Sequence, residues 1–89
     1  MASSAIRIQP HVRSVIDPDG AVLLDLVRGK YYSLNGTGAQ IWQKLEAGLG
    51  VAEIEAELGS GGAPAEQVRD DVREFIDGLR AKQLVHVAG

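Results

Sequence analysis

Apolar and polar residues alternate in short runs over the first third of the chain, and this pattern predicts three β-strands. The strands cover residues 12–16, 21–27 and 30–34. The sequence DPDG at residues 17–20 separates the first two as a turn, because proline presets φ and glycine is permissive at the last position. Arg28-Gly29 separates the second and third as a hairpin turn in which Gly29 can take a positive φ. We therefore expect a three-stranded antiparallel meander.

Helical spacing of apolar residues takes over directly after the third strand. The side chains of Asn35 and Thr37 can accept hydrogen bonds from free helix N–H groups, so a first helix is expected over residues 37–47. A second is expected over residues 51–58, and a third begins at residues 64–65. The third helix has the clearest amphipathic stripe, formed by Val68, Val72, Phe75, Ile76 and Leu79. Strands followed by helices predict an α+β, winged-helix-like fold with a three-stranded antiparallel sheet and three helices.

Length and composition are those of one small globular domain. A chain of 89 residues can bury only one core, so residues 1–89 are expected to form a single domain, with residues 1–5 disordered. The chain has no cysteine, which excludes disulfides and thiolate chemistry. No apolar run approaches the ~20 residues needed to cross a bilayer, and the start does not resemble a secretory signal. We expect a cytoplasmic protein with no membrane partner.

The sequence offers no recognisable catalytic or metal-binding arrangement. His11 and His86 lie near opposite ends of the chain, without the spacing of a zinc site. The serines have no neighbouring histidine, so a hydrolase triad is not supported. Asp70 and Asp71 are adjacent in a helical segment and point about 100° apart, which is typical of a solvated face. We expect a binding module with no catalytic residue, no metal site and no cofactor.

The distribution of charge argues against nucleic acid as the partner. The net charge is −3 and the nine cationic residues are scattered along the chain. Proteins that bind nucleic acid depend on clustered lysine and arginine side chains that contact phosphates. No such cluster is present in the sequence.

The third strand is the candidate binding edge. An edge strand presents unpaired N–H and C=O groups, which natural proteins usually protect with lysine or proline. Pro10 protects the first strand, whereas Lys30 is the one such residue in the third. An extended peptide is therefore expected to add there as a fourth strand, held by backbone hydrogen bonds. The candidate contacts on the strand are Lys30, Tyr31, Tyr32, Ser33 and Leu34.

The third helix is the candidate source of side-chain selectivity, because packed beside the third strand it would form the other wall of a groove. The candidate contacts at i, i+3, i+4 and i+7 are Val68, Asp71, Val72 and Phe75. The pattern also fits a stripe that is entirely core. The core interpretation is favoured for Val72, and the two interpretations are balanced for the other three residues.

The second strand predicts apolar surface on the outer face of the sheet. Leu23, Leu24 and Leu26 cannot all face the helices, because neighbouring strand residues point to opposite sides. Such surface can mark a site for a partner protein, or it can be a few exposed leucines with no binding role. Both interpretations stay open at this point.

Three spaced segments resemble the PqqD-like family of small peptide-recognition domains. They are YYSLNGTGAQIW at residues 31–42, VAEI at 51–54 and DVREF at 71–75, and they occur in the family's order. The similarity runs from roughly Val12 to Val85. The aromatic strand and the helix start that follows it are most similar to the stand-alone leader-binding half of the split lasso-peptide B protein.

The resemblance implies a function as well as a fold. Family members bind the leader segment of a ribosomally synthesised precursor peptide between the third strand and the third helix. For this chain it implies the leader of a lasso-type precursor as ligand, with a leader peptidase and a cyclase as candidate protein partners. The alternative is a PqqD-type peptide chaperone for a radical-SAM enzyme, which would use the same groove for a different client.

A winged-helix DNA-binding regulator is the alternative from another class. It would need a cationic recognition helix. The third helix instead mixes Arg69, Arg73 and Arg80 with Glu66, Asp70, Asp71, Glu74 and Asp77.

Overall fold

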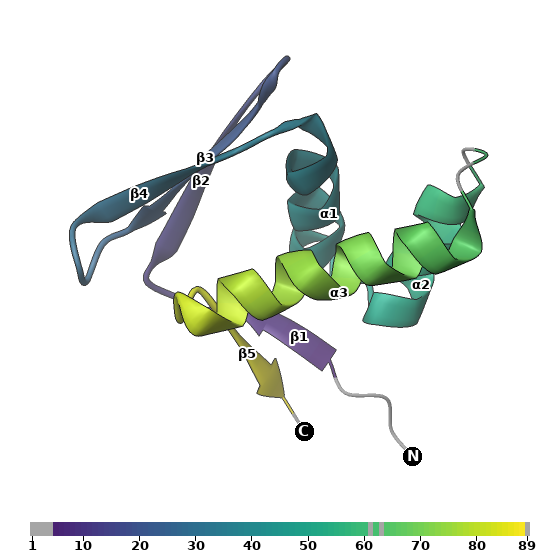
Figure 1. Ribbon diagram of the computed structural model, residues 1–89. Coiled ribbons are helices and arrows are strands. Elements are labelled where there is room, and N and C mark those ends of the chain that lie inside the picture. Colours follow the sequence, from purple (N-terminus) through teal and green to yellow (C-terminus); the bar gives the residue numbers. More distant parts are fainter. Residues whose placement is uncertain (1–4, 61, 63, 89) are drawn as a thin grey trace.

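The computed structural model describes residues 5–60, 62 and 64–88. Three strands forming one sheet are followed by three helices, and the first and last strands pair as a separate small sheet (Figure 1). The elements in chain order are β1 (Ala5–Ile8), β2 (Val12–Asp17), β3 (Gly20–Asp25), β4 (Lys30–Leu34), α1 (Gly36–Glu46), α2 (Val51–Gly59), α3 (Ala65–Ala81) and β5 (Val85–Ala88). The predicted α+β fold, with a three-stranded antiparallel sheet before three helices, is confirmed.

The larger sheet has the strand order β2-β3-β4, and both pairs are antiparallel. Ser14, Leu23 and Tyr32 lie side by side across it and face the helices. Leu23 is fully buried there, and the Ser14 hydroxyl donates a hydrogen bond of 2.7 Å to the Glu46 carboxylate at the end of α1. The opposite face carries Tyr31, which is 71% exposed. The sheet therefore has one covered face and one open face.

Strand β3, predicted over residues 21–27, ends two residues earlier than its apolar pattern predicts. Asp25 is the last strand residue, and its Oδ1 accepts hydrogen bonds from the N–H groups of Val27 and Arg28, both at 3.0 Å. An aspartate that captures these N–H groups turns the chain at that point. Leu26 and Val27 therefore lie in the turn, largely exposed. Gly29 closes the turn with a φ of 68°, as predicted.

The small sheet was only half predicted. The apolar run at residues 84–87 predicts a short extended segment after the third helix, and β5 confirms it. β5 pairs antiparallel with β1 and sets Arg7 opposite His86. No pattern in residues 5–8 identified them as its partner. The expectation of disorder over residues 1–5 is wrong for Ala5, which begins β1, and residues 1–4 lie outside the described part of the chain.

The first helix starts where its capping residue predicts. Asn35 is the N-cap, and its side-chain oxygen accepts a 2.8 Å hydrogen bond from the Gly38 N–H, so α1 begins one residue before Thr37. Trp42 is fully buried on its inner face. The core around it contains side chains from both sheets and all three helices, including Ile6, Leu23, Ile54, Val72 and Leu84. No helix in the described ranges is long and apolar enough to span a membrane.

A buried carboxylate ties the β3–β4 turn to the end of α3. Asp25 is 1% exposed, and its Oδ2 lies 3.1 Å from the Arg28 guanidinium. Arg28 also donates a hydrogen bond to the side chain of Gln83, just after α3. His11 approaches Asp25 from the other side, with Nε2 3.7 Å from Oδ1. The backbone N–H of Arg28, with smaller contributions from its guanidinium, the Val27 N–H and His11, lowers the pKa of Asp25 against the opposing effect of burial.

A substitution at Gly20 tests the packing of the junction between β4 and α1. A Cβ at this position would collide with the backbone carbonyl of Leu34 at the end of β4. Gly20→Ala should therefore lower the free energy of unfolding by roughly 1–3 kcal/mol, measured by urea denaturation. Gly36→Ala is the matched control, because a Cβ there meets no atom within 4 Å. Equal stability of the two variants would contradict the close approach.

Asp25 predicts acid sensitivity. Its pKa is lowered in the folded state, so its stabilisation is complete above the unfolded value of about 3.9 and is lost as the pH falls through the folded pKa. The free energy of unfolding should fall less steeply below pH ~4 in Asp25→Asn than in the wild type. Asp70→Asn, which removes an exposed carboxylate on α3, should keep the wild-type slope. Identical slopes for wild type and Asp25→Asn would overturn the assignment.

Candidate functional site

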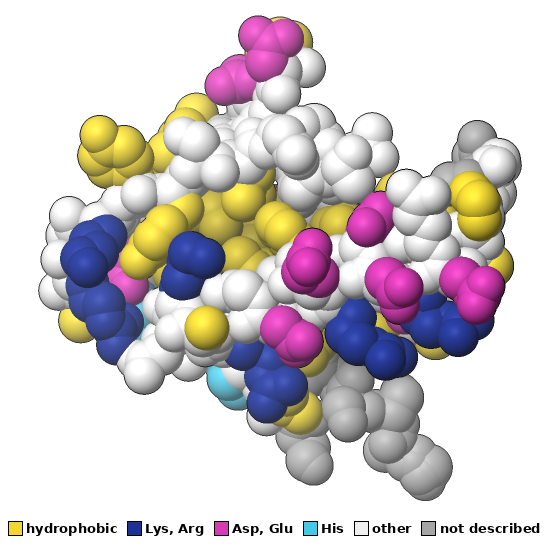
Figure 2. Space-filling model, viewed as in Figure 1, with side chains coloured by type: hydrophobic (Ala, Val, Ile, Leu, Met, Phe, Trp, Pro, Cys, Tyr) yellow, Lys and Arg dark blue, Asp and Glu magenta, His cyan; other side chains and the backbone are white. Residues whose placement is uncertain are grey.

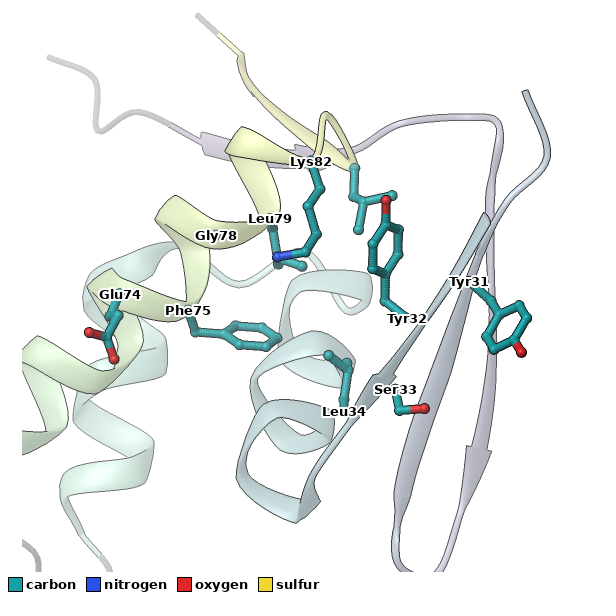
Figure 3. A pocket seen from close by; sticks show the side chains of 10 residues that line it. Tyr31, Tyr32, Ser33, Leu34, Glu74, Phe75, Gly78, Leu79 and Lys82 are labelled. Atoms are coloured by element: carbon teal, nitrogen blue, oxygen red, sulfur yellow. The ribbon is translucent and has the colours of Figure 1, made fainter. Parts of the chain in front are cut away.

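A groove of ≈ 510 Å³ runs between β4 and α3. Figure 3 shows the strand on one side and the helix on the other, with side chains from both directed at the space between them. Figure 2 shows apolar side chains on the floor of this hollow. The lining residues are Tyr31, Tyr32, Ser33, Leu34, Glu74, Phe75, Gly78, Leu79, Lys82 and Leu84.

The strand wall combines a free backbone edge with alternating side chains. β4 pairs with β3 along one edge and is the last strand of its sheet, so its other edge has no strand beside it among the described residues. Tyr32 and Leu34 are half-buried and point toward the groove, whereas Tyr31 points to the outer face (Figure 3). The wall therefore offers backbone hydrogen-bonding groups and two apolar side chains.

The helix wall is apolar at its base and charged at its rim. Phe75 and Leu79 supply the apolar surface, and Gly78 between them has no side chain to fill the space. Lys82 reaches across the groove, with Nζ 5.6 Å from the centroid of the Tyr32 ring. At this distance the ammonium group is attracted to the face of the ring. One end of the groove is therefore cationic, while Glu74 makes the rim acidic farther along α3 (Figure 3).

Phe75 divides this groove from a second hollow. A Cβ at Gly38 would lie 3.0 Å from a ring carbon of Phe75, so the glycine leaves the ring the room it occupies. The second hollow has a volume of ≈ 340 Å³ and lies beyond the end of β4. It is lined by Asn35, Thr37, Gly38, Ile41, Asp71, Glu74 and Phe75.

The structure brings together most, but not all, of the candidate contacts from the sequence. Residues 31–34 and Phe75 line the main groove, and Asp71 lines the second hollow. Lys30 is exposed at the start of β4, outside the groove lining. Val68 and Val72 do not line the groove: they are 7% and 0% exposed and belong to the core. Both valines are therefore core residues, which is the second of the two interpretations that the sequence left open.

Several groove residues were missed by sequence reasoning. Leu79 belongs to the predicted amphipathic stripe and is a core residue that also lines the groove. Gly78 and Lys82 follow Phe75 at i+3 and i+7, the same spacing that identified the candidate contacts two turns earlier. Extending the stripe toward the end of the helix would have found them. Glu74 and Leu84 lie outside that spacing and carried no comparable signal.

The outer face of the larger sheet has the predicted apolar surface. Val15 and Val22 are paired across β2 and β3, and Leu24 and Tyr31 across β3 and β4. Val15 is 57% exposed and Leu24 is half-buried. Leu26, which was expected to share these positions, lies in the turn instead.

The described residues bring no group of three or more histidine, aspartate or glutamate side chains close enough to hold a metal ion. The one buried carboxylate found among them, Asp25, is held by its own turn and by Arg28, and it lies outside the groove lining. The chemistry of the groove is therefore that of strand backbone, apolar side chains and a few exposed charges.

Solved structures with the same fold support the comparison of this groove with peptide sites. The complex of TbiB1 with the TbiA(beta) leader peptide has a TM-score of 0.87 and 31% identity, over 93% of this chain and 98% of that chain. A lasso peptide synthetase B1 complexed with the leader peptide has a TM-score of 0.83 and 27% identity, over 91% of this chain and 96% of that chain. Both similar proteins were solved with a leader peptide bound.

Sequence comparison identifies the family. No curated protein matches this chain. The family of Coenzyme PQQ synthesis protein D (PqqD) matches residues 20–85, from the start of β3 into β5. This range contains β4, the whole of α3, and every residue that lines the groove or the second hollow. Because the match covers most of the chain, the resemblance seen in the sequence is confirmed, and the protein belongs to the PqqD family.

Proposed function

We propose that this protein binds the leader segment of a ribosomally synthesised precursor peptide and delivers it to a separate processing enzyme. The observation that carries the proposal is the groove along the open edge of β4, faced by α3. Two similar structures, each holding a leader peptide, support the same use of this fold. The peptide is proposed to bind as an added strand.

Backbone pairing supplies the part of this binding that does not depend on sequence. An extended peptide beside β4 would satisfy N–H and C=O groups that otherwise bond to water. The added strand would place alternate side chains in the groove, where they meet Tyr32, Leu34 and Phe75. Apolar side chains of the leader would be the anchors, because these three residues supply most of the apolar wall.

Charged residues at the rim would add selectivity. Lys82 at one end of the groove favours an acidic or polar leader residue nearby, and Asp71 and Glu74 at the second hollow favour a donor or a cation. These groups are exposed, so their contribution is expected to be modest and weakened by salt.

The lasso assignment and the delivery step belong to the proposal. The similar lasso peptide synthetase B1, solved with a leader peptide, favours a lasso-type leader. The leader peptidase and the cyclase are proposed as partners because the family resemblance implies them. The alternative client is a peptide that this PqqD family member would present to a radical-SAM enzyme. Both proposed functions use the same groove and require no catalysis by this chain. We place both in the cytoplasm, where precursor peptides are made. The genes beside this one would distinguish the two pathways.

Peptide titration tests strand addition. Adding the TbiA(beta) leader, and the leader of any precursor encoded beside this gene, should shift the backbone amide NMR signals of residues 31–34 and Phe75. The expected affinity is in the micromolar range or tighter. No binding by either peptide, or shifts confined to other elements, would refute the proposal.

Two neighbouring tyrosines provide a matched pair of variants. Tyr32→Ala removes an apolar wall of the groove and should weaken leader binding about tenfold or more. Tyr31→Ala removes the same side chain from the outer face of the same strand and should have a much smaller effect. Isothermal titration measures both, and circular dichroism checks the fold. Equal losses would contradict the proposed orientation of the peptide.

A further inference from the structure

The three arginines of α3 share one side of the helix, whereas three of its acids, Asp70, Asp71 and Glu74, lie on another; Glu66 and Asp77 border the arginines. The three arginines and five acids give α3 a net charge of −2. Arg69, Arg73 and Arg80 nevertheless fall on one row, since their spacings of four and seven residues return to the same side of a helix. Figure 2 shows basic side chains along the lower edge of α3 and acidic side chains in front of and above them. Arg73 and Arg80 line a hollow together with Ile6 of β1 and Val87 of β5, so they lie on the side of α3 that faces these two strands.

A hollow of ≈ 320 Å³ opens beside this basic row. Four apolar residues from four elements form its apolar surface: Ile6 of β1, Val51 of α2, Ile76 of α3 and Val87 of β5. Val87 is 41% exposed, although the β1–β5 sheet and α3 bury most of the apolar residues around it. We call this the basic hollow, because its charged rim consists of Arg73, Arg80 and Asp77.

The arginines of the basic hollow are free to contact another molecule. Arg73 and Arg80 are exposed, and neither makes a hydrogen bond or ion pair of its side chain with any residue in the described ranges. Asp77 lies between them and offsets one of the two charges. Arg69, one turn before Arg73, adds a further positive charge on the same row. The local charge is therefore positive on a protein whose net charge is −3.

The basic hollow and the peptide groove use different sides of α3. The groove is lined by Glu74, Phe75, Gly78, Leu79 and Lys82, whereas the basic hollow is lined by Arg73, Ile76, Asp77 and Arg80. The two sets share no residue. A peptide in the groove therefore leaves the basic hollow open.

We propose that the basic hollow binds an acidic segment of a second protein, which inserts an apolar side chain between Ile76 and Val87 and pairs carboxylates with Arg73 and Arg80. For a protein that presents a peptide, this partner is the processing enzyme, an identification that rests on the proposed function. The apolar surface gives affinity and the arginines select an acidic partner. Because the groove stays free, the enzyme and the peptide can be bound together.

The dimensions favour a protein segment over a broad charged surface. Arg73 and Arg80 are seven residues apart, about 10.5 Å along the helix, which matches carboxylates two turns apart on a partner helix. The hollow has the volume of a small ligand pocket and takes an apolar side chain. A bilayer or a nucleic acid would require a wider cationic surface than one short row of arginines.

A designed peptide tests the basic hollow directly. The probe is a synthetic amphipathic helix with leucines on one face and glutamates beside them, and its matched control has lysines in place of the glutamates. The acidic peptide should shift the amide signals of Ile76, Arg80 and Val87 in the full chain. Its affinity should fall about tenfold or more in the Arg73→Glu, Arg80→Glu double variant and should also fall as salt rises. Arg13→Glu, which reverses an exposed charge on β2, should leave it unchanged.

Three outcomes would overturn the proposal. They are no shifts at these residues, equal binding of the acidic and lysine peptides, and saturation of the same residues by phosphatidylglycerol vesicles, which would indicate a membrane surface instead. Titration of the TbiA(beta) leader into wild type and the double variant separates this proposal from the proposed function. The leader should bind both equally. Wild type that binds the acidic peptide but not the leader refutes the proposed function alone, and wild type that binds the leader but not the acidic peptide refutes the basic hollow alone.

Discussion

The edge of β4 that has no strand beside it in the described part of the chain is the constraint on which the rest of the structure depends. A strand edge that accepts a peptide has no neighbouring strand to support it on that side, so the rest of the fold must hold it in place. Three features hold it: the full register with β3, the close approach of Gly20 to the Leu34 carbonyl, and the Asn35 cap that turns the strand directly into α1. Trp42, fully buried on the inner face of that helix, anchors the junction in the core.

The same constraint explains why the end of α3 is tied down so firmly. The Leu84 N–H donates to the Leu79 carbonyl, and the Gln9 N–H donates to the Leu84 carbonyl, both at 3.0 Å, so the exit from α3 is joined to the chain between β1 and β2. Arg28 links the buried Asp25 to Gln83, which has a φ of 60°. The turn before β4 and Gln83, two residues after the end of α3, are thus joined to each other. The distance between the walls of the groove is set by these contacts.

Local patterns in the sequence were enough for the larger sheet, the helices and the strand wall, because alternation, turn residues and capping act over a few neighbours. They failed where distant segments decide the outcome. Residues 5–8 become a strand only because residues 85–88 lie beside them, and Val27 leaves the strand because Asp25 captures its N–H. On α3, the apolar stripe predicted the core correctly but, of the groove, only Phe75 among the candidate contacts, since β4 meets the helix nearer its C-terminal end, beside Gly78 and Lys82.

A single amphipathic period therefore does not describe α3. Its buried stripe of Val68, Val72, Ile76 and Leu79 separates two exposed sides with different neighbours and different charge. One side closes a groove on an open strand, and the other borders the small sheet formed by the two ends of the described chain. This arrangement also explains the mixed charges that argued against a DNA-recognition helix in the sequence. The arginines are scattered in sequence but gather on one side of α3, where Asp77 offsets only part of their charge, so each side of the helix has its own electrostatic preference.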